Sequence, residues 1–169
     1  IGGKEAAEKR LDEMFRRLDA SYGDEWFASG NEPSFQIPWI YNWAGAPYKA
    51  QQVIRRILNE QYSSRVNGLP GNDDLGSMGA WYVFASIGLF PEIPGVGGFS
   101  VNSPVFRKIV FHLPEGDVII KGGDEKKEYI HSLSLDGKKM EGTWIDWSDL
   151  YRGATLEYKL SGKPDKTWG

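Results

Sequence analysis

Hydrophobic positions in the first half of the chain recur at steps of three and four, a spacing that predicts helices. Pro33 suits the first turn of the second predicted helix and Pro47 opens the third. Gly88 and Pro91 end the fourth. The four predicted helices cover about residues 7–18, 33–44, 47–61 and 75–87.

After residue 95 the apolar period shifts toward two, which predicts β-strands. Between the two halves, residues 91–98 hold two prolines and three glycines and predict a linker or a tight crossover. The dipeptide Asp136–Gly137 is a strong hairpin signal. Helices followed by strands predict an α+β fold with segregated elements. The predicted strands cover residues 108–113, 118–121, 129–135 and 156–160.

Composition narrows the chemistry that the chain supports. The 169 residues carry a net charge of −3 without a basic patch, which argues against nucleic acid and anionic membranes as partners. No apolar run is long enough to predict a membrane span. Cysteine is absent, and only His112 and His131 supply imidazoles. Acid–base chemistry must therefore rest on carboxylates, and a metal site must use oxygen ligands.

Two loops that precede predicted helices carry the candidate chemistry, and the first spans residues 68–76. Asp73 and Asp74 lie there among three glycines. Adjacent acids at a helix start are commonly capping groups that favour the helix dipole. The glycines also permit tight turns and close approach to a ligand, so either carboxylate is also a candidate general base or a ligand of a hard cation.

The second loop spans residues 30–34, where Asn31 and Glu32 precede Pro33. Asn31 is a plausible helix cap with the proline inside the first turn. A side-chain amide and a carboxylate also offer the oxygen atoms that Ca²⁺ binds. Both interpretations remain open from the residues alone.

Tryptophans have two interpretations as well. Trp39, Trp43 and Trp81 have core-compatible spacing within the predicted helices, so packing in the core is favoured. Trp144 and Trp147 flank Asp146 in the strand region and are candidates for a surface platform that stacks on sugar rings.

Five motifs stand out along the chain: NEPSFQIPWIYNWAGAPYKAQ, GLPGNDDLGSMGAWYVFASIGLFPEIPG, VNSPVFRKIVFHL, YIHSLSLDGKKM and KPDKTWG. Together they resemble glycoside hydrolase family 92, a family of calcium-dependent exo-α-mannosidases. The resemblance spans essentially the whole chain, and the motifs occur in the family's order. It implies that residues 1–95 form the helical part of an (α/α)6-type catalytic toroid and that residues 96–169 form a C-terminal β-sandwich-like antiparallel region.

The resemblance also implies roles. Hydrolysis in the family inverts the anomeric carbon, with one carboxylic acid as general acid and one carboxylate as general base. Asp74 occupies the position of the base, and Asp73 supports the loop or the water. Asn31 and Glu32 occupy the calcium-site loop. The family's general acid is a Glu in an upstream motif that has no counterpart here. We therefore expect the chain to require the upstream part of the same enzyme and to be inactive alone.

Two departures from the family pattern matter. Some relatives carry an acid where this chain has Asn72, so a second base candidate is missing. Relatives that prefer α-1,2 linkages carry a His-Glu pair before the Asn-Glu-Pro motif, whereas this chain has Asp24 and Glu25 there and no His. The resemblance therefore does not imply an α-1,2 preference.

The expected substrate is a terminal α-mannoside of a glycan, and family analogy predicts a periplasmic or secreted enzyme. Two other function classes are alternatives. A carbohydrate-binding module would bind sugars weakly without hydrolysis, and a structural accessory domain would bind neither calcium nor sugar.

Overall fold

The computed structural model describes residues 2–21 and 23–169, and the chain divides into two compact units, residues 1–83 and 84–169. Helices make up the first unit and strands make up most of the second, so the predicted α+β class is confirmed. The division lies within a helix, at Val83, whereas the sequence predicts the boundary between the helical and the β region at residue 95. The assignment of those two parts to a toroid and a sandwich stays a prediction.

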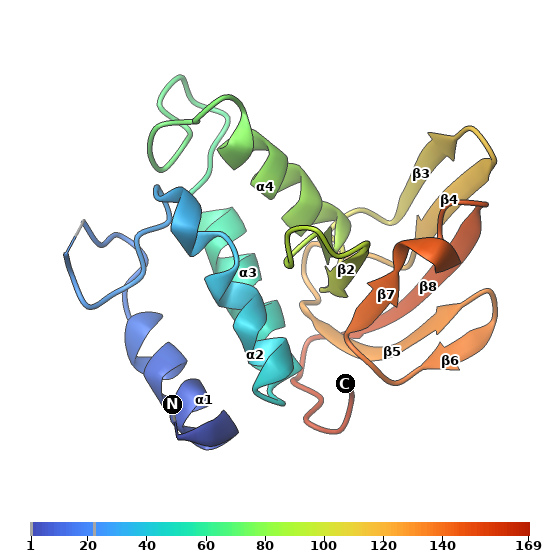
Figure 1. The fold of residues 1–169 in the computed structure, drawn as a ribbon, viewed down its shortest axis with the longest axis horizontal. Coiled ribbons are helices and arrows are strands. Elements are labelled where there is room, and N and C mark those ends of the chain that lie inside the picture. The colour runs from blue at the N-terminus through green and yellow to red at the C-terminus, as the bar shows by residue number, and fades with distance from the viewer. Residues whose placement is uncertain (1, 22) are drawn as a thin grey trace. The chain divides into compact units, whose positions relative to one another are not determined.

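Three helices of the first unit lie side by side (Figure 1). Where the first of these helices ends, the ring of Phe15 lies 4.9 Å from that of Phe27, in the following loop, and 5.8 Å from that of Tyr41 on the second helix, measured between ring centroids. The fourth helix continues from this unit into the next. The helices are α1 (Gly3–Met14), the 3-10 turns η1 (Glu32–Ser34) and η2 (Ile37–Trp39), α2 (Ile40–Trp43), α3 (Pro47–Glu60) and α4 (Ser77–Ile87).

The single helix predicted over residues 33–44 is wrong, because the segment is broken into η1, η2 and the four-residue α2. Pro33 lies in the first turn of η1 and Pro38 lies in the first turn of η2. A proline inside a helix has no N–H to donate and its ring clashes with the carbonyl four residues earlier. Pro38 therefore prevents one continuous helix.

The tryptophan predictions for the first unit are partly confirmed. Trp39 and Trp81 are buried, but Trp43 is 51% exposed, so its assignment to the core is wrong. In a continuous α-helix, positions 39 and 43 would share one face. The change from a 3-10 turn to an α-helix at residue 40 alters the rotation per residue, which breaks that relationship.

The second unit holds two sheets, with strand orders β1-β2-β7 and β3-β4-β8-β5-β6. The larger sheet is mixed, because β8 pairs in parallel with β4 and antiparallel with β5. The prediction of a purely antiparallel sheet is therefore corrected: the last strand returns to lie between β4 and β5. The strands are β1 (Leu89–Phe90), β2 (Gly98–Val101), β3 (Lys108–Leu113), β4 (Gly116–Lys121), β5 (Tyr129–Leu135), β6 (Lys138–Met140), β7 (Trp144–Asp146) and β8 (Ala154–Ser161), with the 3-10 turn η3 (Trp147–Asp149) before β8.

One hydrophobic cluster joins both sheets of this unit. Val101 of β2 and Ile145 of β7 belong to the same buried cluster as Ile120 of β4 and Leu156 of β8. The predicted hairpin is confirmed, because Asp136 and Gly137 connect β5 to β6 with φ angles of 48° and 77°. Positive φ at both central residues is the conformation that a tight type I′ turn requires.

Candidate functional site

The two candidate loops of the first unit meet through glycine backbones. A Cβ atom placed on Gly71 would lie 2.7 Å from the Cα of Gly30. A Cβ atom placed on Gly30 would lie 2.7 Å from the carbonyl oxygen of Pro70. Side chains at either position would collide with backbone, so this approach requires glycine on both sides. The contact brings together segments that directly precede Asn31 and Asn72.

Ser29 fixes the first loop to the neighbouring helix. Its buried hydroxyl lies 3.0 Å from Oε1 of Gln61 and 3.3 Å from the carbonyl oxygen of Leu18. Beside it is a hollow of about 390 Å³, whose lining includes Asn31 from one loop and Gly71 from the other. Sequence reasoning missed both Ser29 and Gln61; the one available signal was that Ser29 directly precedes the Gly-Asn-Glu motif.

Asn31 and Glu32 lie where the chain enters η1. Asn31 takes the N-cap position with extended backbone angles, but its side chain makes no capping hydrogen bond. Its carbonyl oxygen accepts a hydrogen bond from the N–H of Ser34 at 2.8 Å. Glu32 is exposed, and its carbonyl accepts from the N–H of Phe35. The start of η1 is therefore formed by backbone groups and not by the Asn31 amide.

Asn31 and Glu32 offer the type of ligand that a hard cation binds, but two side chains are too few to hold one. An amide oxygen and a carboxylate are suitable Ca²⁺ donors, yet Ca²⁺ takes about six to eight oxygen ligands. Within the described residues, no group of three or more Asp, Glu or His side chains is placed to hold a metal ion. Further ligands would have to be backbone carbonyls, water, sugar hydroxyls or groups outside these 169 residues.

Asp73 holds the start of α4. Its Oδ1 accepts a hydrogen bond from the N–H of Gly79 at 3.1 Å. Its carbonyl oxygen accepts from the N–H and from the hydroxyl of Ser77, both at 2.9 Å. The capping interpretation is therefore correct for Asp73.

Asp74 is in a different situation. It is exposed, and among the described residues its carboxylate accepts a hydrogen bond only from the side-chain amide of Asn72. Asp74, Leu75 and Gly76 have φ angles of 47°, 61° and 92°, three left-handed residues in succession. This is why α4 begins at Ser77 and not at Leu75 as predicted. Left-handed backbone at two non-glycine residues is costly and is often found at functional sites.

Tyr62 links the second loop to α4, and sequence reasoning missed it. Its ring stacks on Trp81, with 5.9 Å between centroids and 10° between planes. Burial raises the pKa of Tyr62 above its ordinary value, and the nearby negative charge of Asp73 raises it further. Trp81 in turn donates from Nε1 to the carbonyl oxygen of Phe35, at 3.0 Å, directly after η1. Tyr62 and Trp81 therefore connect α4 to the residue that follows η1.

The sequence matches a known family model over nearly its whole length. Residues 1–162 match the model described as the glycosyl hydrolase family 92 catalytic domain. The chain is also 34% identical, over 159 residues, to an uncharacterized secreted glycosidase from Arthroderma benhamiae. That match covers 90% of this chain and 20% of the relative.

Solved structures of the same family are similar throughout the chain. The GH92 alpha-mannosidase BT3965 from Bacteroides thetaiotaomicron is 32% identical with a TM-score of 0.88, over 98% of this chain and 23% of that one. The GH92 inverting mannosidase BT2199 from the same organism is 28% identical with a TM-score of 0.87, over 99% of this chain and 26% of that one. BT3965 has also been solved in complex with mannoimidazole. The chain thus spans about a quarter of these structures.

Proposed function

Because the chain belongs to glycosyl hydrolase family 92, we propose that it forms part of an inverting, calcium-dependent exo-α-mannosidase acting on terminal α-mannosides of glycans. The observation that carries this proposal is the contact of Gly30 with Gly71. It brings the Asn31–Glu32 loop and the Asn72–Asp74 loop together, as a sugar site shared by both loops requires.

Asp74 is the proposed general base. An inverting glycosidase needs a carboxylate that removes a proton from the attacking water while a separate acid protonates the leaving oxygen. The Asp74 carboxylate is exposed and takes no part in capping a helix, so it is available to water. Asp73, whose carboxylate is committed to the N–H of Gly79, is the proposed positioning residue for the loop.

A second carboxyl group has to lie on the opposite face of the sugar, about 6.5–9.5 Å from the base in enzymes of this type. The resemblance assigns it to an upstream Glu motif without a counterpart in these 169 residues. We therefore propose that an upstream part of the same polypeptide completes the site and that this chain alone does not hydrolyse mannosides.

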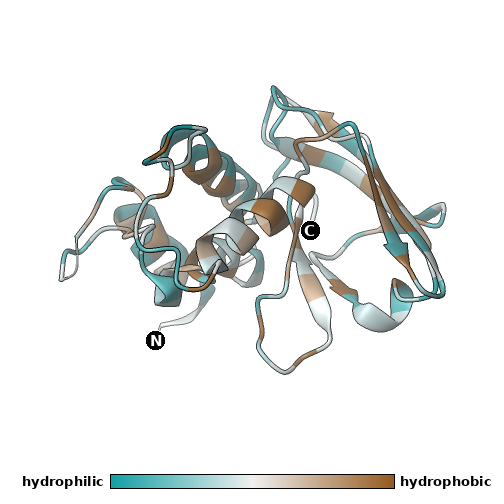
Figure 2. Ribbon diagram, turned by 90° about the horizontal axis from the view of Figure 1, so that it is seen from above, coloured by the Kyte–Doolittle hydropathy of each residue, from teal (hydrophilic) through white to brown (hydrophobic). Residues whose placement is uncertain are grey.

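The apolar character of α4 also supports the proposal that the site is completed by polypeptide outside these 169 residues. α4 contains no charged residue, and Figure 2 draws it largely in white and brown. Tyr82 and Val83 are nevertheless 41% and 54% exposed. A helix that is apolar all round is normally buried in a larger assembly. The proposed context is the (α/α)6-type toroid, with the strands of the second unit as part of a β-sandwich.

Asn31 and Glu32 are the proposed calcium ligands from this chain, through their side-chain oxygens. When bound, Ca²⁺ would supply electrostatic orientation of the mannose 2- and 3-hydroxyls. The role of the chain itself is to hold the two ligands at the start of η1, beside the loop that carries Asp74.

Export is proposed by analogy with the glycosidase from Arthroderma benhamiae, which is described as secreted. Within the part of the chain that the structure describes, every helix is too short or too polar to cross a membrane. The proposal includes no linkage preference, since the chain lacks the His-Glu pair that accompanies α-1,2 specificity in relatives.

Release of mannose from an aryl α-mannoside with added calcium tests the proposal. Three samples are compared: the full-length enzyme, its Asp74→Asn variant, and the 169-residue chain. We expect activity in the first sample alone. Activity of the Asp74→Asn variant equal to that of the wild type would show that Asp74 is not the base. Sugar binding by the 169-residue chain, together with full activity of the variant, would favour a carbohydrate-binding module.

A further inference from the structure

Strand β3 forms one edge of the five-stranded sheet in the second unit (Figure 1). It pairs with β4 through all six of its residues, and no strand of the described chain pairs with its other side. Ile109, Phe111 and Leu113 turn toward the hydrophobic cluster, and Val110 is also apolar. Natural edge strands are usually short, charged or covered, because unpaired N–H and C=O groups recruit another strand. β3 is neither short nor strongly charged.

An apolar groove opens beside this edge. It has a volume of about 250 Å³, and the described residues that line it are all apolar. Phe111 and Leu113 of β3 line it together with Phe84, Phe99 and Trp147, and Trp147 is 43% exposed. A cavity of about 150 Å³ is enough to take up a benzene-sized group, and water is a poor occupant where no polar partner exists. The groove therefore has room for apolar side chains from outside the unit.

The polar groups at this edge add a charge preference. His112 is paired with Asp117, at 2.9 Å. Lys108, at the start of β3, is exposed and has no ion pair among the described residues. A segment placed along β3 would gain most from a carboxylate near Lys108 and apolar side chains near Phe111 and Leu113.

We propose that an extended, apolar segment of the polypeptide outside these 169 residues pairs with the free edge of β3 and places alternate side chains in the groove. This inference rests on the proposed function, in which the chain is one part of a longer enzyme. About three-quarters of each similar solved structure lies outside the region that this chain matches, so enough polypeptide exists to supply the segment. An added strand hydrogen-bonds to the free N–H and C=O groups of the edge, and its alternate side chains give specificity.

A second copy of this chain fits the groove less well. If two β3 strands paired edge to edge, each copy would have to fill its partner's groove. The inward-facing side chains Ile109, Phe111 and Leu113 already pack against their own hydrophobic cluster, so they are not available. Two copies of Lys108 would also add like charge to the interface.

Site-specific photo-crosslinking in the full-length enzyme tests the inference. The photoreactive residue p-benzoylphenylalanine replaces Trp147 at the rim of the groove, and mass spectrometry identifies the captured peptide. We expect an intramolecular crosslink to a peptide outside the 169 residues, with alternating apolar positions. The matched control places the same group at Lys159, which lies on the polar outer face of the same sheet, and should not capture that peptide. Crosslinks confined to the 169 residues, to a second copy or to a different protein would overturn the inference.

Hydrogen exchange gives an independent measurement. Amides of residues 108–113 should exchange at least about tenfold more slowly in the full-length enzyme than in the 169-residue chain, with the inner strand β8 as reference. Equal protection of β3 in both samples, with β8 also unchanged, contradicts the proposal. Activity is assayed on the same full-length sample. An active enzyme that depends on Asp74 but shows no crosslink defeats this inference alone, whereas an active enzyme that does not need Asp74 defeats the proposed base.

Discussion

Gly30 and Gly71 touch backbone to backbone, and their contact joins the two loops that carry every proposed site residue of this chain. The contact is steric and needs no side chain. Neither glycine has a positive φ angle, so backbone conformation alone does not demand glycine at these positions. Glycine is required because the space between the loops leaves no room for a Cβ atom.

Gly71→Ala is therefore expected to push the loops apart. The added methyl would lie 2.7 Å from both the Cα and the carbonyl oxygen of Gly30, so backbone must shift. Overpacking of this kind costs about 1–3 kcal/mol of stability. We expect mannosidase activity of the full-length enzyme to fall at least about tenfold, because small displacements of catalytic groups are costly.

Gly142→Ala is the matched control, since a Cβ there meets nothing within 4 Å and its φ is not in the left-handed region. It should leave both activity and the urea midpoint unchanged. If Gly71→Ala behaves like this control, the loop contact has no functional importance.

Substitutions of the adjacent residues Asp73 and Asp74 should have different effects on kcat and on stability. Asp74→Asn should reduce kcat by about 10²–10⁴-fold, the usual contribution of acid–base catalysis, with little change in stability. Asparagine tolerates the left-handed conformation at φ 47°, so the backbone should be retained. Asp73→Ala instead removes the acceptor for the N–H of Gly79 and should cost about 0.5–2 kcal/mol of stability.

Steady-state kinetics and urea unfolding on both variants distinguish these roles. A large loss of kcat in Asp73→Ala combined with unchanged stability would reverse the assignment. Equal losses of stability in both variants would mean that Asp74 is also a structural residue.

Much of this arrangement was predictable from local sequence, and the rest depends on contacts between distant segments. The periodic runs predicted α1 and α3, and Asp136–Gly137 predicted the β5–β6 hairpin, because each signal is local. The glycines around Asp73 and Asp74 predicted tight turns. Which glycine meets which, however, depends on how two loops about forty residues apart approach each other, and spacing along one chain carries no such information. The parallel pairing of β8 with β4 was unpredictable for the same reason.

Removal of calcium should abolish the activity of the full-length enzyme, and added calcium should restore it. If Asn31 and Glu32 supply ligands, Asn31→Ala and Glu32→Gln should each raise the calcium concentration needed for half-maximal activity. A tenfold rise corresponds to about 1.4 kcal/mol of lost binding. Calcium titration followed by calorimetry gives the affinity directly and does not depend on turnover.

Glu5→Gln is the control for a lost surface charge, because Glu5 is an exposed acid on α1, away from both loops in sequence. It should leave the calcium requirement unchanged. Chelation without any effect on wild-type activity would exclude the calcium site altogether.

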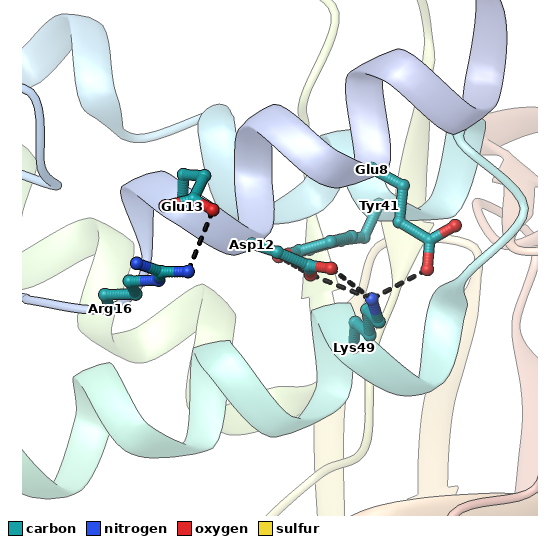
Figure 3. A network of polar contacts seen from close by, with 6 residues as sticks. All are labelled: Glu8, Asp12, Glu13, Arg16, Tyr41 and Lys49. Atoms are coloured by element: carbon teal, nitrogen blue, oxygen red, sulfur yellow. Dashed lines mark hydrogen bonds and ion pairs between the residues drawn. The ribbon is translucent and has the colours of Figure 1, made fainter.

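Lys49 connects α1, α2 and α3 through the network drawn in Figure 3. Its ammonium lies 2.7 Å from Glu8 Oε1 and 2.6 Å from Asp12 Oδ2, and Tyr41 donates a hydrogen bond to Asp12 Oδ1 at 2.9 Å. Burial by itself would lower the pKa of Lys49, but its bonds to Asp12 and Glu8 outweigh burial and raise that pKa above its ordinary value. Burial and the hydrogen bond to Asp12 raise the pKa of Tyr41 as well.

Both groups should make the fold sensitive to alkali. A folded-state pKa above the unfolded value means that the stabilisation is complete below the unfolded pKa, about 10 for either side chain, and is lost as pH rises toward the folded pKa. The free energy of unfolding, measured in urea between about pH 8 and pH 12, should therefore fall above about pH 10. Tyr41→Phe has no phenol that could ionise at this position, so its free energy of unfolding should fall less steeply above pH 10. At pH 8 the variant should be less stable than the wild type, because the hydrogen bond to Asp12 is lost. An identical slope in Tyr41→Phe and wild type above pH 10 would show that Tyr41 does not contribute to the alkaline transition.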